Sequence, residues 1–284
     1  MYPILQKEML APTLGKFVLR APFIARKRRA GNFVMLRVVE SGERIPLTIV
    51  DGDPEAGTIT LIVQAIGKTT RLLMTKNAGD AVPDVVGPLG NPTPIENHGI
   101  VVCVGGGVGT AELLPIARAL REAGNTIIAI IGGRTHELVI LEEEMGSVSR
   151  EVIVTTDDGS RGRRGIVTDP LAELLRGKET IGAVYAIGPL PMMRAVADLT
   201  RSTGVKTLVS LNAIMIDGTG MCGGCRVTVG GRMKFACVDG PEFDAHTVDF
   251  DELIMRNRTY REEEMVADRL LKDHECRLQK ELPA

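Results

Sequence analysis

The hydrophobic pattern of the sequence changes near residue 98, and this change limits the possible folds more than any other feature. Before it, short β-rich runs are separated by Gly, Pro and Asp turns, as in "FVLRA", "NFVMLRVVE", "RIPLTIV" and "TITLIVQAI". Only "KTTRLLMTKNA" has helical periodicity in this part. Short strands at this spacing predict an antiparallel β-barrel over residues 1–97.

From "GIVVCVGGG" onward, apolar strands alternate with helices. The first strand runs into glycines, and the helix "TAELLPIARALREAG" follows and ends at Gly124. We expect further strands at "TIIAIIGG", "EVIVTT" and "AVYAIGP", and helices around "HELVILEEEM" and "DPLAELLRG". This alternation predicts a doubly wound parallel α/β domain over residues 98–212, followed by a charged, helical C-terminal region over 213–284.

The composition is that of an ordinary globular protein, with 44% apolar and 25% charged residues. A net charge of −2 and an aromatic content of 3% argue against a nucleic-acid partner. No apolar run reaches the roughly 20 residues that a membrane span needs. The N-terminus also lacks a basic segment followed by an apolar core, so we expect a cytoplasmic protein without an export signal.

The stretch "VVCVGGGVGTAELL" combines a buried strand, a glycine turn and a helix start. Glycines at Gly105, Gly107 and Gly109 would let backbone N–H groups approach a pyrophosphate at the helix N-terminus. Thr110 holds the last position of the pattern, which is therefore not a strict GxGxxG. Nucleotide binding is the favoured interpretation, and a turn without a ligand stays open. Cys103, inside the apolar strand, is expected in the core.

Two further stretches are candidates for phosphate or ring binding. In "ERIPLTI", Arg44 could form charge-assisted hydrogen bonds to a phosphate, although an Arg on a strand is more often a surface charge. The residues after it, Pro46, Leu47 and Thr48, could line a flat ring. "GKTTRLL", residues 67–73, places a glycine and hydroxyls at a helix start, without the spacing of a P-loop.

Three cysteines cluster in the C-terminal region, in the pattern Asp217-x4-Cys222-x2-Cys225-x11-Cys237. Plant-type [2Fe–2S] sites have the spacing C-x4-C-x2-C…C, and Asp217 stands where the first cysteine would be. A zinc site with His246 as fourth ligand is a second interpretation. A redox dithiol is the weakest, because "RVTVGG" after the cysteines is typical of a strand and turn rather than a helix.

These motifs, in this order, resemble the ferredoxin–NADP reductase superfamily. Within it, the chain is similar to electron-transfer subunits of dihydroorotate dehydrogenase and most similar to small subunits of NADH-dependent reduced ferredoxin:NADP oxidoreductase, also called sulfide dehydrogenase. "GERIPLTIVD", "AIGKTT" and "VGPLGNP" look like the FAD segments, and "DGTGMCGGCRV" looks like the cluster loop. One departure is Ala30, where the family usually has a Pro, which affects only that turn.

The resemblance implies FAD, a [2Fe–2S] cluster and NAD(P)H as cofactors. It favours Asp217 as fourth cluster ligand, because these small subunits carry one Asp and three Cys, whereas the dihydroorotate relatives carry four Cys. No catalytic side chain is implied. The implied metal ligands are Asp217, Cys222, Cys225 and Cys237, and the implied cofactor-binding residues are Arg44, Pro46, Leu47, Thr48, Gly67, Lys68, Thr69, Thr70, Gly105, Gly106, Gly107, Gly109, Thr110, Arg134, Asp157, Gly159, Ser160, Gly188 and Met192.

The implied activity is exchange of hydride with NAD(P)H at FAD, followed by single-electron transfer through the cluster to a larger iron–sulfur flavoprotein partner. In the family this pair exchanges electrons with ferredoxin by flavin-based bifurcation. An electron-transfer subunit of dihydroorotate dehydrogenase or sulfide dehydrogenase is the alternative enzyme, and a nucleotide-binding redox sensor or zinc module the alternative without turnover. Arg134 does not decide between NADH and NADPH, since it could meet a 2′-phosphate or a pyrophosphate.

Overall fold

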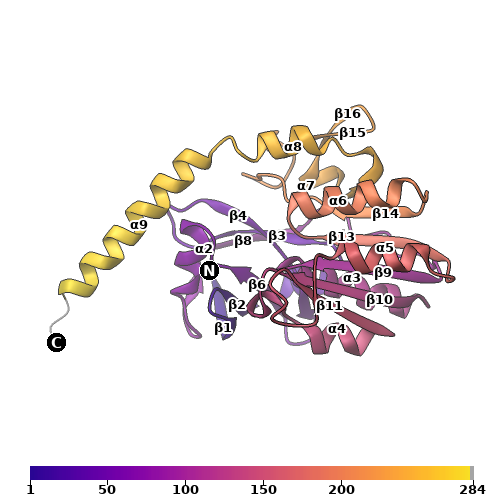
Figure 1. Cartoon of the computed structure of the whole chain (residues 1–284). Coiled ribbons are helices and arrows are strands. Elements are labelled where there is room, and N and C mark those ends of the chain that lie inside the picture. The colour runs from indigo at the N-terminus through magenta and orange to yellow at the C-terminus, as the bar shows by residue number, and fades with distance from the viewer. Residues whose placement is uncertain (282–284) are drawn as a thin grey trace.

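The computed structural model describes residues 1–281 of the chain. Antiparallel strands form the N-terminal part, a seven-stranded sheet with flanking helices forms the middle, and a hairpin with short helices follows it (Figure 1). A long C-terminal helix then returns from the hairpin region to the N-terminal part (Figure 1). The last three residues of the predicted region 213–284 lie outside the described residues.

The N-terminal part contains β1 (Tyr2–Ala11), β2 (Leu14–Arg20), α1 (Pro22–Lys27), β3 (Phe33–Arg37), β4 (Arg44–Thr48), β5 (Asp51–Asp53), β6 (Thr58–Gln64), α2 (Lys68–Met74), β7 (Ala81–Val82) and β8 (Asp84–Leu89). The strands form a five-stranded sheet, β5-β6-β2-β1-β7, and a three-stranded sheet, β4-β3-β8, with all pairs antiparallel. Apolar side chains of both sheets, including Phe17, Leu36 and Leu61, share one buried core. This is the predicted antiparallel barrel.

The α/β part contains β9 (Ile100–Gly106), α3 (Gly109–Glu122), β10 (Thr126–Gly133), η1 (His136–Leu138), α4 (Glu142–Val148), β11 (Glu151–Thr156), β12 (Arg163–Arg164), α5 (Thr168–Arg176), β13 (Ile181–Ile187), α6 (Leu190–Arg201) and β14 (Lys206–Ser210). The order β12-β11-β10-β9-β13-β14 is parallel throughout. The chain moves outward in opposite directions from β9, so a crevice opens where β9 and β13 end, and such crevices bind ligands in this class of fold.

The C-terminal region contains β15 (Arg226–Val229), β16 (Arg232–Phe235), α7 (Ala236–Asp239), β17 (Glu242–Asp244), η2 (Ala245–Thr247), α8 (Phe250–Arg256) and α9 (Arg261–Glu281). Strand β17 adds antiparallel to β14 and so joins the large sheet. Helix α9 reaches α2, where Arg71 Nε lies 2.8 Å from Asp268 Oδ1. The C-terminal region is thereby connected to both preceding parts. The predicted domain boundaries at 97 and 212 stay predictions.

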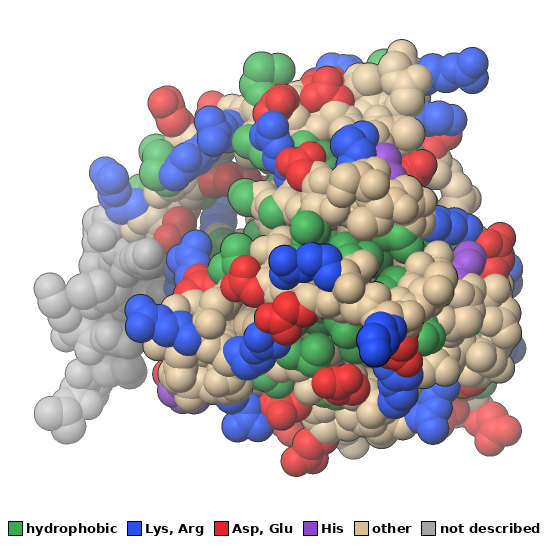
Figure 2. All heavy atoms as spheres, turned by 45° about the vertical axis from the view of Figure 1, so that its right-hand side comes forward, with side chains coloured by type: hydrophobic (Ala, Val, Ile, Leu, Met, Phe, Trp, Pro, Cys, Tyr) green, Lys and Arg blue, Asp and Glu red, His purple; other side chains and the backbone are tan. Residues whose placement is uncertain are grey.

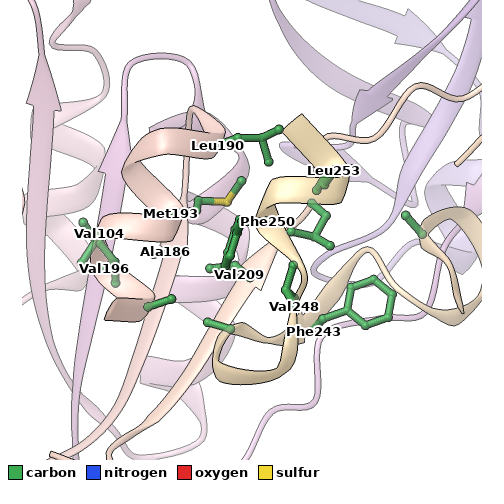
Figure 3. Close-up of a cluster of buried hydrophobic side chains, with 14 of the residues drawn as sticks. Val104, Ala186, Leu190, Met193, Val196, Val209, Phe243, Val248, Phe250 and Leu253 are labelled. Atoms are coloured by element: carbon green, nitrogen blue, oxygen red, sulfur yellow. The ribbon is translucent and has the colours of Figure 1, made fainter. Parts of the chain in front are cut away.

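Apolar contacts hold this region to the α/β sheet. Figure 3 shows Val104 and Ala186 of the sheet and Met193 of α6 in the same cluster as Phe250 and Leu253 of α8. These residues are almost completely buried. Because one cluster includes residues on both sides of position 212, the cysteine loop is fixed relative to the nucleotide-binding sheet.

The surface carries charges of both signs. On the face in Figure 2, Lys and Arg side chains alternate with Asp and Glu. Within the described part of the chain, no helix is long and apolar enough to span a bilayer.

Three local features differ from the sequence expectations. The helix expected around "HELVILEEEM" is interrupted: η1 ends at Leu138, and Leu141 has a left-handed φ of 57° before α4 begins. Such a φ ends helical geometry for a residue with a Cβ. Helix α1 was not expected, and neither was the addition of β17 to the large sheet.

Candidate functional site

The glycine turn between β9 and α3 lies at the crevice. Gly107 has a φ of +56°, and nothing lies within 4 Å of the position where a Cβ would be. Gly109 is enclosed instead, because a Cβ there would overlap the carbonyl oxygen of Ile187. Gly109 therefore serves the packing of α3 on β13, while Gly107 leaves open space above the turn. That space suits a pyrophosphate at a helix N-terminus.

Residues from two separate segments, 106–110 and 188–192, meet at this turn. A Cβ on Gly188 would lie 2.9 Å from Met192 Sδ, and one on Gly106 would overlap the same sulfur. Thr110 is fully buried, and its Oγ1 has no hydrogen-bond partner among the described residues. The structure therefore brings these four predicted residues together. Cys103, in the middle of β9, is buried in the core between Ala129 and Tyr185, as predicted.

The loops after β10 and β11 hold the remaining predicted nucleotide contacts. Asp158 N donates to the Arg134 carbonyl at 3.3 Å, and Ser160 Oγ accepts from His136 N at 2.8 Å. Ser160 also donates to Asp158 Oδ1, and this hydroxyl lowers the pKa of Asp158. Arg134, Asp157, Gly159 and Ser160 thus lie in two adjoining loops at one edge of the sheet.

Strand β4 carries the residues predicted to hold the flavin. The Arg44 guanidinium, expected at a phosphate, contacts Asp84 Oδ2 through Nε at 3.1 Å and Nη2 at 2.8 Å. Pro46, Leu47 and Thr48 are half-buried and leave part of their surface open. They can still line a ring, whereas Arg44 has an ion pair that any phosphate contact must share or replace.

The predicted phosphate seat at the start of α2 is partly engaged by its own side chains. Thr70 Oγ1 accepts from Gly67 N at 3.1 Å and donates to the Gly67 carbonyl at 2.9 Å. Thr69 Oγ1 lies 3.3 Å from Glu43 Oε2. Lys68 lines a groove between α2 and α9 together with Glu262. The open backbone at Gly67, with nothing within 4 Å of its Cβ position, is the part left for a ligand.

Two of the three thiols predicted as ligands already lie together. Cys225 Sγ and Cys237 Sγ are 3.2 Å apart and buried, while Cys222 is exposed on the loop. Two thiolates on one tetrahedral metal at about 2.3 Å would lie roughly 3.7 Å apart, so this pair needs little adjustment. Burial raises the pKa of Cys237 to about 12, and a bound metal would have to displace that proton.

Asp217 binds the loop backbone. One oxygen accepts from Thr219 N at 2.6 Å and the other from Cys222 N at 2.8 Å. These hydrogen bonds, with that from Thr219 N first, lower the pKa of Asp217. Gly220, φ +84°, gives the loop a conformation that disfavours other residues. The carboxylate that was predicted as a ligand acts here as the cap of the turn.

The four predicted ligands are thus close in the chain but not converged. Among the described residues, no three His, Cys, Asp or Glu side chains are arranged to hold a metal. The donor types fit an iron–sulfur cluster, because the carboxylate and two thiols lie on one glycine-rich loop and the third thiol, on α7, lies against Cys225. The zinc alternative with His246 fits less well, since His246 Nε2 lies 2.9 Å from Thr200 Oγ1 on α6.

Two acidic residues were missed by the sequence reasoning. Glu112 lies in the first turn of α3, where burial raises its pKa to about 7 against a smaller, opposing hydrogen bond from Thr48. Glu242 begins β17, where burial raises its pKa to about 8. An acidic residue in a first helical turn is ordinary, so the sequence held no signal for Glu112. Glu242 had none either, because β17 was not expected.

Comparison with known proteins identifies the family. A model of the iron–sulfur cluster binding domain of dihydroorotate dehydrogenase B matches residues 212–249. A Thermotoga maritima protein named as a homologue of the dihydroorotate dehydrogenase B (NAD(+)) electron transfer subunit is 49% identical over 95% of each chain. This chain belongs to that electron-transfer subunit family. The Geobacillus kaustophilus electron transfer subunit is 35% identical, over 86% of this chain and 96% of that one.

A solved structure has the same fold over nearly the whole chain. The chain is similar to one from the structure of NADH-dependent reduced ferredoxin–NADP oxidoreductase, studied for flavin-based electron bifurcation. The TM-score is 0.89 at 48% identity, covering 94% of this chain and 96% of that one. The predicted fold and family resemblance are therefore confirmed. The individual residues predicted to contact FAD, the nucleotide and the cluster stay predictions.

Proposed function

We propose that this protein takes electron pairs from NAD(P)H at FAD and passes them singly through a [2Fe–2S] cluster to a larger partner subunit. The observation that carries the proposal is the group of Asp217 and three cysteines within residues 212–249, a segment that matches an iron–sulfur domain. It is supported by the crevice at the glycine turn and by strand β4, which carries the residues predicted to hold the flavin. When bound, FAD supplies hydride acceptance, and the cluster supplies single-electron transfer.

The residues of this chain bind and orient. The backbone at Gly107 receives the nucleotide pyrophosphate, and Met192 lies over the neighbouring glycines at the floor of the crevice. Strand β4 supports the flavin ring through Pro46, Leu47 and Thr48. The apolar cluster that joins α6 to α8 fixes the cysteine loop beside this crevice. Fixed separation is what electron transfer requires of a protein scaffold, and no side chain needs to act as a base.

The loop surface favours a protein partner. Met221 is 89% exposed beside Cys222, and the half-exposed Ile216 adjoins the same loop at Gly224. Val238, also exposed, packs on Gly220. Apolar side chains gathered around an exposed ligand are typical of a surface that becomes buried in a complex. We assign the electron outlet and the larger subunit to this surface, and we place the complex in the cytoplasm, where free thiols persist.

The finer assignment is to an electron-bifurcating NADH-dependent reduced ferredoxin:NADP oxidoreductase, with ferredoxin reached through the partner. The 48% identity and TM-score of 0.89 to a chain of that complex support it. The second candidate, an electron-transfer subunit of dihydroorotate dehydrogenase, is supported by the 35% identical relative. Purifying the native complex separates them: the first carries a second iron–sulfur flavoprotein, and the second oxidises dihydroorotate.

The cluster ligands are tested by substitution and EPR. Carboxylate and thiolate are both anions, so Asp217→Cys keeps the charge and changes covalency and hydrogen bonding. We expect a retained cluster with altered g-values and potential in that variant, and a labile cluster in Asp217→Ala. Cys225→Ala should lose most of the iron. The proposal for Asp217 fails if both Asp217 variants keep the wild-type spectrum and His246→Ala loses it.

A further inference from the structure

A network of ion pairs joins the barrel to helix α3. Asp51, the first residue of β5, accepts a hydrogen bond from Arg118 Nη1 through Oδ2 at 2.9 Å. Its other oxygen accepts from Arg28 Nη2 at 3.1 Å and from Gly52 N at 2.8 Å. Arg28 Nη2 also donates to the Gly52 carbonyl at 2.9 Å. Arg28 and Asp51 both belong to the barrel, so the contact with Arg118 is the part of this network that crosses to the α/β part.

Asp51 is rigidly connected to β4, the strand predicted to support the flavin. Thr48 is the last residue of β4, and Ile49 and Val50, which lead from it to Asp51, are both buried. Val50 N also donates to the Thr60 carbonyl of β6 at 2.9 Å. A short segment that is buried and hydrogen-bonded in this way is among the least mobile parts of a fold. The backbone of Asp51 therefore has a fixed position relative to β4.

Arg118 lies on the helix that begins at the glycine turn. Helix α3 extends from Gly109 to Glu122, and Leu114 and Leu120 are among its buried side chains. Because a packed helix of this length moves as one body, a displacement at Arg118 is also felt at its first turn. The position of Arg118 is therefore coupled to that of the Gly107 backbone, which is predicted to receive the pyrophosphate.

Apolar contacts hold the two parts together but do not fix their alignment by themselves. Val50 and Ile62 of the barrel share a buried cluster with Leu114 of α3. The hydrophobic effect is non-directional, so such a contact tolerates small sliding movements. A charge-assisted hydrogen bond has a preferred length and direction. The contact between Asp51 and Arg118 can therefore select one alignment of the two parts.

A pocket beside this ion pair leaves room for such movement. It has a volume of about 760 Å³, and Pro92, Pro94 and Pro115 line it together with Asp51 and Arg118. The side chains of Arg118 and Asp51 are 34% and 49% exposed. An ion pair with this exposure contributes little to stability, because water and salt screen it. Its effect on alignment can therefore be measured without unfolding the protein.

We propose that Asp51 and Arg118 are positioning residues, whose ion pair aligns the nucleotide turn with β4 and so sets the distance between the nicotinamide ring and the flavin. They act through the elements that carry them, not by contact with either ligand. Hydride transfer depends steeply on this distance, since a displacement of about 1 Å can cost roughly 100-fold in rate. The affinity for each ligand depends on its own site and is independent of the pair. The proposal rests on the proposed function, because it needs FAD on β4 and NAD(P)H at Gly107.

The ion pair is tested first in the cofactor-free protein by hydrogen–deuterium exchange. Asp51→Asn and Arg118→Met each remove the attraction while nearly keeping the size of the side chain. We expect amides of β5 and of the last turns of α3 to exchange about twofold to fivefold faster in both variants, as fits a half-exposed ion pair. The double variant should exchange no faster than Asp51→Asn alone, because both changes remove the same contact.

Glu179→Gln is the matched control. It removes the ion pair between Arg150 and Glu179, which has a distance of 2.6 Å and similar exposure but lies within the α/β part. The amides of β5 and α3 should therefore exchange in this variant as they do in wild type.

The positioning role is tested in FAD-loaded protein by stopped-flow reduction with NADH or NADPH. Asp51→Asn and Arg118→Met should lower the limiting reduction rate about tenfold. They should leave the nucleotide Kd unchanged and weaken the long-wavelength charge-transfer absorbance of the complex between nucleotide and flavin. Arg118 contacts Asp51 through a single nitrogen, so Arg118→Lys, which keeps the charge, should recover most of the rate. Glu179→Gln should match wild type in all three measurements.

Wild-type limiting rates in both Asp51→Asn and Arg118→Met overturn the proposal, and so does a loss that appears only in the nucleotide Kd. Amide exchange that is unchanged in the cofactor-free variants overturns it as well, because the ion pair would then not hold the two parts. A wild-type chain that binds no flavin, or whose flavin neither nucleotide reduces, overturns the proposed function instead. The cofactor-free exchange measurement distinguishes these two failures.

Discussion

Replacing Gly107 by Ala separates ligand binding from backbone strain at the nucleotide turn. Gly107 has φ +56°, a conformation that costs a residue with a Cβ about 1–2 kcal/mol. No atom lies within 4 Å of the new methyl group, so no packing clash adds to this cost. We therefore expect a loss of about 1 kcal/mol in unfolding free energy and a Tm lower by about 2–4 °C.

Gly204 offers a matched control. It follows α6 with φ +67°, and it also has nothing within 4 Å of its Cβ position. Gly204→Ala should therefore lose the same stability as Gly107→Ala. Only Gly107→Ala should lose nucleotide affinity, because its methyl group occupies the space above the helix N-terminus. A loss of at least tenfold, or about 1.4 kcal/mol, is expected for a displaced pyrophosphate.

The assay is the rate of flavin reduction as a function of NADH or NADPH concentration under anaerobic conditions, with FAD and iron contents measured for each protein. Gly107→Ala should need at least tenfold more nucleotide, with normal FAD and iron. Equal nucleotide dependence in Gly107→Ala and Gly204→Ala would refute the reasoning, because the turn would then be only structural.

Two further predictions concern a pH dependence and an ion pair. Because the folded pKa of Glu242 is about 8, the folded protein binds more protons than the unfolded chain between about pH 4.5 and pH 8, so unfolding free energy should fall by roughly 5 kcal/mol over that range and level off above it. Urea unfolding at several pH values should show this fall in wild type and its absence in Glu242→Gln. Arg44→Ala should weaken FAD retention by about tenfold or more, as expected for a lost charged hydrogen bond, whereas Asp84→Asn, which frees the guanidinium, should retain FAD. Equal FAD loss in both variants would mean that Arg44 only joins β4 to β8.

The order of strands and helices followed from the sequence because the apolar period differs between the barrel and the α/β part. The break at Leu141 did not follow from the sequence, because a left-handed position that is not occupied by glycine leaves no local signal. Gly106, Gly188 and Met192, each predicted to contact the nucleotide, adjoin one another because strand ends in a parallel sheet meet at one edge, and their contact with the nucleotide stays a prediction. The addition of β17 to the large sheet depended on tertiary structure.

The role of Asp217 illustrates why part of the site could not be predicted. Spacing placed it among the thiols, but its oxygens have alternative partners in the N–H groups of Thr219 and Cys222. Which partner prevails depends on the competition between a metal and two backbone hydrogen bonds, and spacing carries no information about that competition. Glu242 was missed for a related reason, since its carboxyl lies beside Gly31 and Thr93, which are distant from it in the sequence.

The most direct test of electron flow through this chain is low-temperature EPR of the isolated, FAD- and iron-reconstituted protein after anaerobic addition of NADH or NADPH. The account predicts that the signal of a reduced [2Fe–2S] cluster appears with either nucleotide or both. It also predicts that the signal is absent when the nucleotide is added to protein stripped of FAD, although dithionite still produces it. The account would be contradicted by a reconstituted protein with full FAD that shows no such signal, either after the nucleotide is added or after dithionite is added.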